Sequence, residues 1–279
     1  MLHQLYEKVS ASCCYVTVFL GQEKISDGTG FAYTATGEVL TAAHVVTGRW
    51  PIRSEDYRAP EQRIFCKFPG LPLVEYSVFF CAITFEVQSF SEPIQLDLAL
   101  LLPKSPFVQA VSYLPALAHP PTLGERVFVA GYSDELVLPF QFEKLLSKTV
   151  NGVPAYLEAM EKGYMADMTG PLIKQGHVGN VRRIIAEDAK AGDRIECDFM
   201  YIDNSMHPGA SGGPVFNTNG DAVGVITKRA VTSASQDHYP KLEVPSGCTI
   251  GLGLQPLLHV ARKTGGANPS LHRTAFGSR

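Results

Sequence analysis

The sequence predicts an all-β protein, a sandwich or a barrel, with a helical stretch in its second half. Short apolar runs of strand length recur along the 279 residues, and Gly or Pro turns separate them. Only 18% of the residues are charged, below the usual quarter, which indicates buried strands. Residues 103–121 are rich in proline and divide the strands into two series, so we expect a linker between two halves.

The expected elements follow from the spacing of apolar residues and turns. The first series contains strands at 15–20, 31–33, 39–41, 64–68, 78–87 and 96–102, and the second at 127–131, 176–185, 196–202, 214–216 and 222–227. Residues 141–148 and 155–168 have helical spacing instead. We expect the apolar face of 155–168 to pack on the body of the protein, with a substrate-gating role as the alternative. This face consists of Tyr156, Leu157, Met160, Tyr164 and Met165.

Composition argues against several kinds of partner and cofactor. Acids exceed bases by 27 to 24 without a basic stripe, so no nucleic acid is expected. No apolar run reaches 18 residues, so no membrane partner is expected. The six cysteines form no CxxC pair, and neither a metal cluster nor a phosphate-binding glycine loop is visible, so we expect no metal and no cofactor.

The cysteines and the N-terminus together predict a cytoplasmic location. Six cysteines are too sparse for a disulfide scaffold, which favours buried free thiols in a reducing compartment. Residues 11–20 are mildly apolar but lack a basic flank and a cleavage site. Cleavage behind them would remove a strand, so we expect no signal peptide.

Three segments carry residues suited to nucleophilic catalysis. TAAHVV contains His44, LDLALL places Asp97 in an apolar strand, and HPGASGGP surrounds Ser211 with glycines. A serine hydroxyl needs a base to take its proton, and an aspartate can orient that base. Burying a carboxylate without a partner is costly, so we expect a partner for Asp97. The glycines allow backbone N–H groups to face a developing oxyanion.

Together these motifs resemble those of the trypsin-like serine peptidases of chymotrypsin fold, most closely the HtrA (Deg) branch. GTGF at 28–31, Asp203 eight positions before the serine, and NGDAVGVIT at 219–227 resemble motifs of that branch. The resemblance covers roughly 12–262 and implies two antiparallel six-stranded β-barrels with the site in the cleft between them. No PDZ domain follows, which departs from that branch.

The resemblance also implies the organisation of the chain, taken as a single peptidase domain over 1–279. Its parts are an N-terminal barrel at 8–105, a linker at 106–121, a C-terminal barrel at 122–262 with an insertion at 133–175, and a disordered tail at 263–279. A cytoplasmic peptidase must be restrained, so a regulatory protein partner is an open expectation. The insertion is our candidate for that control.

By this resemblance the protein is a serine endopeptidase that acts on proteins or peptides through an acyl-enzyme. Ser211 would attack the scissile carbonyl, His44 would shuttle the proton and Asp97 would orient it. The N–H groups of Gly209 and Ser211 would form the oxyanion hole. The hydroxyl of Thr227 is expected to contact Asp97.

The substrate pocket is expected to combine a floor at Ser205 with walls that include Thr227, Lys228, Arg229 and Gly251. A short neutral floor cannot pair with a substrate lysine or arginine, so we expect a small or medium apolar residue at the cleavage position. If Arg229 or His207 turned into the pocket, an acidic residue would be preferred instead. Ala210 stands where digestive trypsins carry an aspartate, which pairs with the new α-amino group after N-terminal cleavage. Since Ala210 offers no carboxylate, we expect activation without N-terminal cleavage. The oxyanion loop would then be ordered by local packing or by a partner.

Two other functions remain open at this point. The GxSxG pattern at 209–213 also fits an α/β-hydrolase esterase, whose acid and histidine must follow the serine in the chain. Asp221 or Asp237 with His238 or His259 could formally serve, although few residues follow Ser211 and repeated βα units are lacking. The second alternative is a catalytically silent peptide-binding module on a protease fold.

Overall fold

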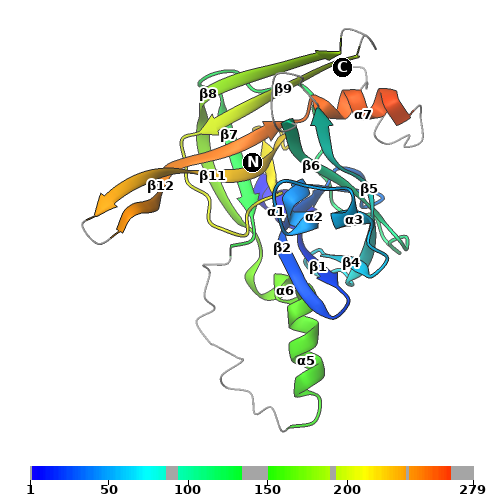
Figure 1. Cartoon of the computed structure of the whole chain (residues 1–279). Helices are drawn as coiled ribbons and strands as arrows, with labels where there is room; N and C mark the ends of the chain where they lie inside the picture. The colour runs from blue at the N-terminus through cyan, green and yellow to red at the C-terminus, as the bar shows by residue number, and fades with distance from the viewer. Residues whose placement is uncertain (1, 86–93, 134–149, 189–192, 237–238, 265–279) are drawn as a thin grey trace.

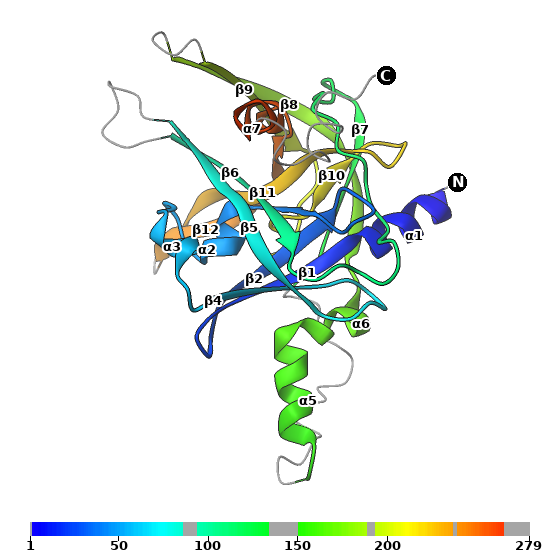
Figure 2. The same ribbon diagram turned by 90° about the vertical axis from the view of Figure 1, so that its right-hand side faces the viewer.

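The computed structural model describes residues 2–85, 94–133, 150–188, 193–236 and 239–264, and these form two closed antiparallel barrels (Figures 1 and 2). The strand order is β1-β2-β3-β6-β5-β4 in the first barrel and β10-β11-β12-β9-β8-β7 in the second. The predicted fold of two six-stranded barrels is therefore confirmed. The larger core cluster includes residues of both barrels, such as Leu100 and Phe128.

The first barrel has six strands near the positions that the sequence predicts, although β2 begins eight residues before the strand expected at 31–33. They are β1 (Cys13–Leu20), β2 (Glu23–Ala32), β3 (Val39–Thr41), β4 (Gln62–Lys67), β5 (Val74–Phe85) and β6 (Ile94–Pro103). Two short helices, α2 (Ala43–Thr47) and α3 (Glu55–Arg58), lie between β3 and β4. Gly48 ends α2 with φ +69°, a conformation that favours glycine, and its N–H donates to the His44 carbonyl at 2.8 Å.

The second barrel contains two hairpins that extend well beyond it (Figure 1). Its strands are β7 (Arg126–Gly131), β8 (Leu172–Asp188), β9 (Asp193–Ile202), β10 (Pro214–Phe216), β11 (Ala222–Gln236) and β12 (Tyr239–Gly253), followed by α7 (Pro256–Thr264). The insertion expected at 133–175 ends earlier than that, because Leu172 already pairs with Gly131 in the β7–β8 ladder.

The N-terminal helix α1 (Leu2–Ser12) and the linker both connect the barrels. The sequence reasoning predicted no helix at these residues. The ring of Tyr6 packs edge-on against Phe128 of β7, with 6.0 Å between centroids. In the linker, the Leu114 N–H donates to Ala32 of the first barrel at 2.9 Å, and the Leu117 N–H donates to Ala222 of the second at 2.7 Å. The linker is therefore an ordered bridge.

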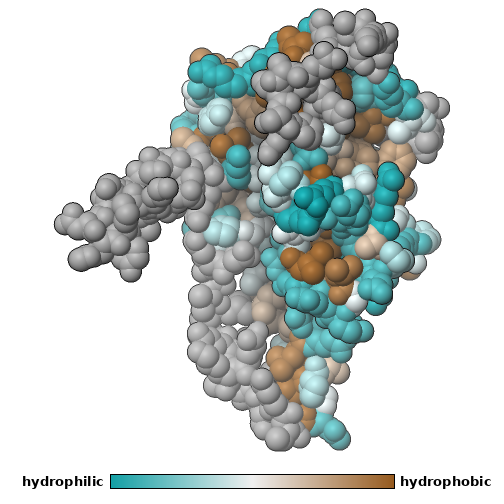
Figure 3. Space-filling view, in the orientation of Figure 1, coloured by the Kyte–Doolittle hydropathy of each residue, from teal (hydrophilic) through white to brown (hydrophobic). Residues whose placement is uncertain are grey.

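The insertion contains α5 (Val153–Ala159), a π-helical turn η1 (Met160–Tyr164) and α6 (Ala166–Thr169). The predicted helical character of 155–168 is confirmed, whereas 141–148 lie outside the described residues. The expected packing of the apolar face is wrong for α5, which projects away from the barrels (Figures 1 and 2). Apolar side chains remain exposed along the insertion, as Figure 3 shows, and Tyr156 keeps 37% of its surface.

Within the described part of the insertion, η1 and α6 rest on the first barrel. The Lys67 ammonium of β4, itself 1% exposed, donates to the Asp167 carboxylate at 2.6 Å. The Thr17 hydroxyl of β1 donates to the Lys162 carbonyl at 2.8 Å. These contacts fix η1 and α6 and explain why α5, which lacks such contacts among the described residues, extends outward. Within the described residues, no helix has the length and apolarity needed to span a bilayer.

Candidate active site

His44 is presented by the short helix α2 at the edge of the first barrel. Val45 and Val46 are 1% and 0% exposed, so they fix the helix on the core. The side chain of His44 remains 31% exposed on the opposite side of this helix. Local sequence therefore places the imidazole at the surface of a rigid element.

Asp97 in β6 is the partner of this imidazole. Its Oδ2 lies 2.7 Å from His44 Nδ1, and its Oδ1 accepts the His44 backbone N–H at 3.0 Å. Because an ionised carboxylate only accepts, Nδ1 must carry the proton and Nε2 is left as the acceptor. The Asp97 side chain is 14% exposed, so the partner expected from the cost of burying a carboxylate is His44.

Ser211 lies in a turn of the second barrel that requires its glycines. Gly212 has φ +85°, and a Cβ there would lie 2.1 Å from the Thr29 carbonyl oxygen. A Cβ at Gly213 would lie 2.0 Å from the Ala130 carbonyl oxygen. The GASGGP segment therefore allows two close backbone approaches that no other residue type could make.

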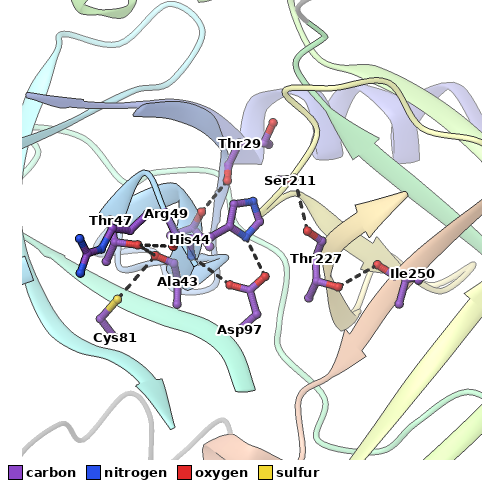
Figure 4. A network of polar contacts seen from close by, with 11 residues as sticks. Thr29, Ala43, His44, Thr47, Arg49, Cys81, Asp97, Ser211, Thr227 and Ile250 are labelled. Carbon is purple, nitrogen blue, oxygen red and sulfur yellow. Dashed lines mark hydrogen bonds and ion pairs between the residues drawn. The ribbon is translucent and has the colours of Figure 1, made fainter. Parts of the chain in front are cut away.

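The nucleophile candidate lies close to the histidine helix of the other barrel. A Cβ at Gly28 would lie 2.7 Å from Val45 and 3.1 Å from the Ser211 carbonyl oxygen, so both residues border the same point. Figure 4 shows the imidazole of His44 between Asp97 and Ser211 in that view. The Ser211 hydroxyl donates to the Thr227 carbonyl at 3.4 Å, and among the described residues it has no hydrogen bond to His44.

Thr29 of β2 fixes the candidate oxyanion loop from the other barrel. Its N–H donates to the Ser211 carbonyl at 2.9 Å, and its hydroxyl donates to the Gly209 carbonyl at 2.8 Å. The same hydroxyl oxygen accepts the Tyr132 N–H at 2.9 Å, where the insertion begins. Within the described part of the chain, the N–H groups of Gly209 and Ser211 donate to no protein acceptor, as an oxyanion site requires.

The sequence alone does not predict this role of Thr29, although Thr29 lies in the GTGF motif at 28–31. The two bonded residues lie 180 positions apart, so no local pattern reveals the contact. The flanking glycines were the available signal, because they indicate close backbone approach at this strand.

The predicted pocket floor is held from two sides. The Thr249 hydroxyl of β12 accepts the Met206 N–H at 3.0 Å and donates to the Asn204 carbonyl at 2.9 Å. From β8, the Lys174 ammonium donates to the Ser205 carbonyl at 2.5 Å. Lys174 is a second residue that sequence reasoning missed, because nothing local places β8 against this segment.

The predicted pocket walls lie on β11 and β12, as their register shows. Lys228 pairs with Ile250, and Gly251 pairs with Ile226. The side chain of Lys228 is exposed, and that of Arg229 lies outside the described residues.

The expected contact between Thr227 and Asp97 is wrong. The Thr227 hydroxyl donates instead to the Ile250 carbonyl at 3.3 Å. A register shift between Ile226 and Lys228 bulges the strand at this residue and turns its side chain toward β12. The contact of Thr227 with the candidate site is instead made by its backbone carbonyl, which accepts the Ser211 hydroxyl.

The partners of the esterase alternative are not assembled at Ser211. Asp221 accepts a bond from the Asn217 amide at 3.3 Å, and His259 lines a separate cavity of about 650 Å³ between α7 and the linker. Asp237 and His238 lie outside the described residues. The two barrels also exclude the α/β-hydrolase fold that this alternative needs.

A buried thiol lies behind the histidine helix. The Cys81 Sγ lies 3.7 Å from the Ala43 carbonyl oxygen. Burial raises the pKa of Cys81, and the charge of Asp97 raises this pKa further. The thiol therefore stays protonated beside the carboxylate at neutral pH.

Comparisons with known proteins agree with this architecture. The Rv3671c protease of M. tuberculosis in its active form is similar in structure, with TM-score 0.50 and 17% identity over 94% of this chain and 84% of that chain. Its inactive form gives the same TM-score and identity over 94% of this chain and 93% of that chain. At this identity the likeness concerns the fold.

Sequence comparison identifies the family. No curated protein matches the chain. The family model described as the trypsin-like peptidase domain matches residues 28–225, which contain His44, Asp97 and Ser211. The chain therefore belongs to the trypsin-like peptidase family.

Proposed function

We propose that the protein is a serine-type endopeptidase that hydrolyses peptide bonds in protein or peptide substrates through an acyl-enzyme. The observation that carries this proposal is that Asp97 binds His44 twice. Its Oδ2 lies 2.7 Å from Nδ1, and its Oδ1 accepts the backbone N–H at 3.0 Å. This pair of contacts fixes the ring with Nε2 as the proton acceptor, and Ser211 lies on a glycine turn close to the helix that carries His44.

The proposed reaction starts with a rotation of the Ser211 hydroxyl from the Thr227 carbonyl toward His44 Nε2. The oxygen attacks the scissile carbonyl while His44 takes the proton and Asp97 stabilises the imidazolium. The resulting oxyanion accepts the N–H groups of Gly209 and Ser211. His44 then gives the proton to the departing amine, which leaves an ester on Ser211.

The second half of the reaction repeats these steps with water. His44 Nε2 takes a proton from water, and the hydroxide adds to the acyl carbon. Collapse of this intermediate breaks the ester bond, and the proton returns from His44 to Ser211. The chain's own residues thus supply a nucleophile, a base and an oxyanion site.

Free thiols support a cytoplasmic location, which is part of the proposal. All six cysteines are free, and Cys248 is the one that is not fully buried. A reducing compartment keeps such thiols unpaired.

A fluorophosphonate probe tests the proposal, because it reacts with activated serines. Intact mass should show one adduct, located at Ser211, in the wild type. Ser211→Ala should show none, and His44→Ala should label far more slowly. His259→Ala is the matched control and should label as the wild type does. Absence of any adduct would favour the silent module, and loss of labelling in His259→Ala would contradict the assignment of His44 as the base.

A further inference from the structure

Lys174 brings a positive charge to the floor of the predicted substrate pocket. Its Nζ donates to the Ser205 carbonyl at 2.5 Å and lies 3.2 Å from His207 Nε2. Both of these partners are acceptors without a negative charge. An ammonium has three N–H donors, so one donor remains for a further ligand.

The charge of this lysine is not balanced by an acid, in contrast to that of four other described lysines. Ion pairs join Lys24 to Asp27, Lys67 to Asp167, Lys104 to Glu75 and Lys162 to Glu158. Among the described residues, no carboxylate lies within 4.0 Å of the Lys174 ammonium. The remaining donor and the uncompensated charge point to an anionic ligand.

Around the predicted pocket, the nearest acid in sequence contacts another residue, and the charged residues of the walls are basic. Asp203, the acid nearest in sequence to Ser205, accepts the His177 N–H at 2.5 Å and lies 3.4 Å from its imidazole. On the predicted walls, the charged residues are Lys228 and Arg229, both basic.

We propose that Lys174 gives the peptidase a preference for an acidic residue at the position just before the scissile bond. The inference rests on the proposed function and names its substrate class. A substrate glutamate that reaches the Ser205 floor would accept the remaining Lys174 N–H as a charge-assisted hydrogen bond. A substrate lysine or arginine would meet like charge in a half-buried site, where attraction and repulsion are screened less than in water.

A neutral isostere isolates the effect of charge from that of size. Matched peptides with Glu, Gln or Leu before the scissile bond are compared by kcat/KM. In the wild type we expect Glu to exceed Gln by roughly 10- to 100-fold, the range in which one charge-assisted contact acts. In Lys174→Met this ratio should fall to about one, and Lys174→Arg, which keeps the charge, should retain part of it. The matched control is Lys104→Met, which removes the same charge from the first barrel and should leave the ratio unchanged.

Two results would overturn the inference. One is a Glu-to-Gln ratio of about one in the wild type. The other is an equal loss on all three peptides in Lys174→Met, which would mean that the lysine only holds the Ser205 carbonyl. Peptidyl phosphonates with the same three side chains, read by the rate of Ser211 labelling, give the ratio without turnover. If neither these nor the fluorophosphonate labels Ser211, the proposed function itself fails; labelling without preference defeats this inference alone.

Discussion

The two barrels hold their parts of the candidate site by different means. In the first barrel, α2 and β6 are neighbouring elements, and two bonds join His44 to Asp97 within that barrel. In the second, the loop that carries Gly209 and Ser211 takes two bonds from Thr29 of the opposite barrel. The His44–Asp97 pair therefore depends on one barrel, whereas the proposed nucleophile and the candidate oxyanion loop depend on how the barrels meet.

This difference suggests how the loop is ordered without a buried carboxylate. Ala210 is 1% exposed, and a Cβ at Gly131 would lie 2.7 Å from it. Close packing on β7 and the two Thr29 bonds hold this loop where digestive trypsins carry the aspartate of their charge pair. These contacts support the prediction that local packing can order the oxyanion loop, and activation without N-terminal cleavage stays a prediction.

The largest effect is expected from Asp97→Asn, which breaks the pair of the first barrel. An asparagine no longer fixes the proton on Nδ1, so kcat should fall by roughly 10⁴. Steady-state kinetics on a cleaved peptide measure this, with Asp221→Asn as a control acid near the second barrel's turn. Near wild-type turnover in Asp97→Asn would show that another group orients His44.

The next largest effect is expected from Thr29→Val, which removes a contact between the two barrels. Thr29→Val removes the hydroxyl between Gly209 and Tyr132 while the shape is nearly kept. Loss of one oxyanion donor costs about 10²–10³ in kcat, and a displaced donor should cost less, about 10- to 100-fold. KM should change by less than about threefold, because the lost contact matters mainly to the developing oxyanion.

Thr29→Ser keeps the hydroxyl and serves as the matched control. It should retain most of the activity, and both variants can be compared in thermal unfolding. Equal kcat in the two variants would mean that the hydroxyl does not position the loop. A loss of kcat in Thr29→Ser but not in Thr29→Val would instead point to packing of the methyl group, which valine retains and serine lacks.

Sequence predicted the parts of this site that short segments encode. His44, Asp97 and Ser211 each stand in a local pattern of strand, apolar run or glycine turn. The strand series predicted a sandwich or a barrel, and the two six-stranded barrels were expected from the family resemblance. Thr29 and Lys174 act through partners 180 and 31 positions away, so their roles depend on tertiary structure.

Two further differences have physical causes that a single sequence does not display. The Thr227 side chain turns toward β12 because of a bulge, and a register shift leaves no mark in the residue pattern. The outward course of α5 follows from where Lys67 meets Asp167, a contact between distant segments.

A smaller effect is expected where the insertion rests on the first barrel. Asp167→Asn leaves the buried Lys67 ammonium without its counter-charge, although the Phe68 carbonyl at 2.9 Å still accepts from it. Removing one partner of a fully buried pair costs about 3–5 kcal/mol, and the exposure of Asp167 reduces this to about 1–3 kcal/mol. We expect a lower melting temperature with kcat changed by less than about threefold, because Thr29 holds Tyr132 independently.

The same insertion provides the control for this variant. Glu158→Gln removes the exposed pair with Lys162 and should leave the melting temperature unchanged, because exposed pairs contribute little. Equal melting temperatures for the two variants would mean that the Asp167 contact does not anchor the insertion. A large fall in kcat in Asp167→Asn alone would instead couple the insertion to the site.

The smallest effect is expected from Cys81→Ala, which changes the packing beneath α2 in the first barrel. Cys81 packs beneath α2 with its Sγ 3.7 Å from the Ala43 carbonyl oxygen, at the outer limit of a weak thiol contact. Because burial raises its pKa, the thiol is neutral, and Cys81→Ala changes no charge near Asp97. The small cavity should cost about 1 kcal/mol of stability. If the two bonds from Asp97 suffice to hold His44, kcat should change by less than about threefold; a loss approaching that of Asp97→Asn would show that packing beneath α2 orients the imidazole as well.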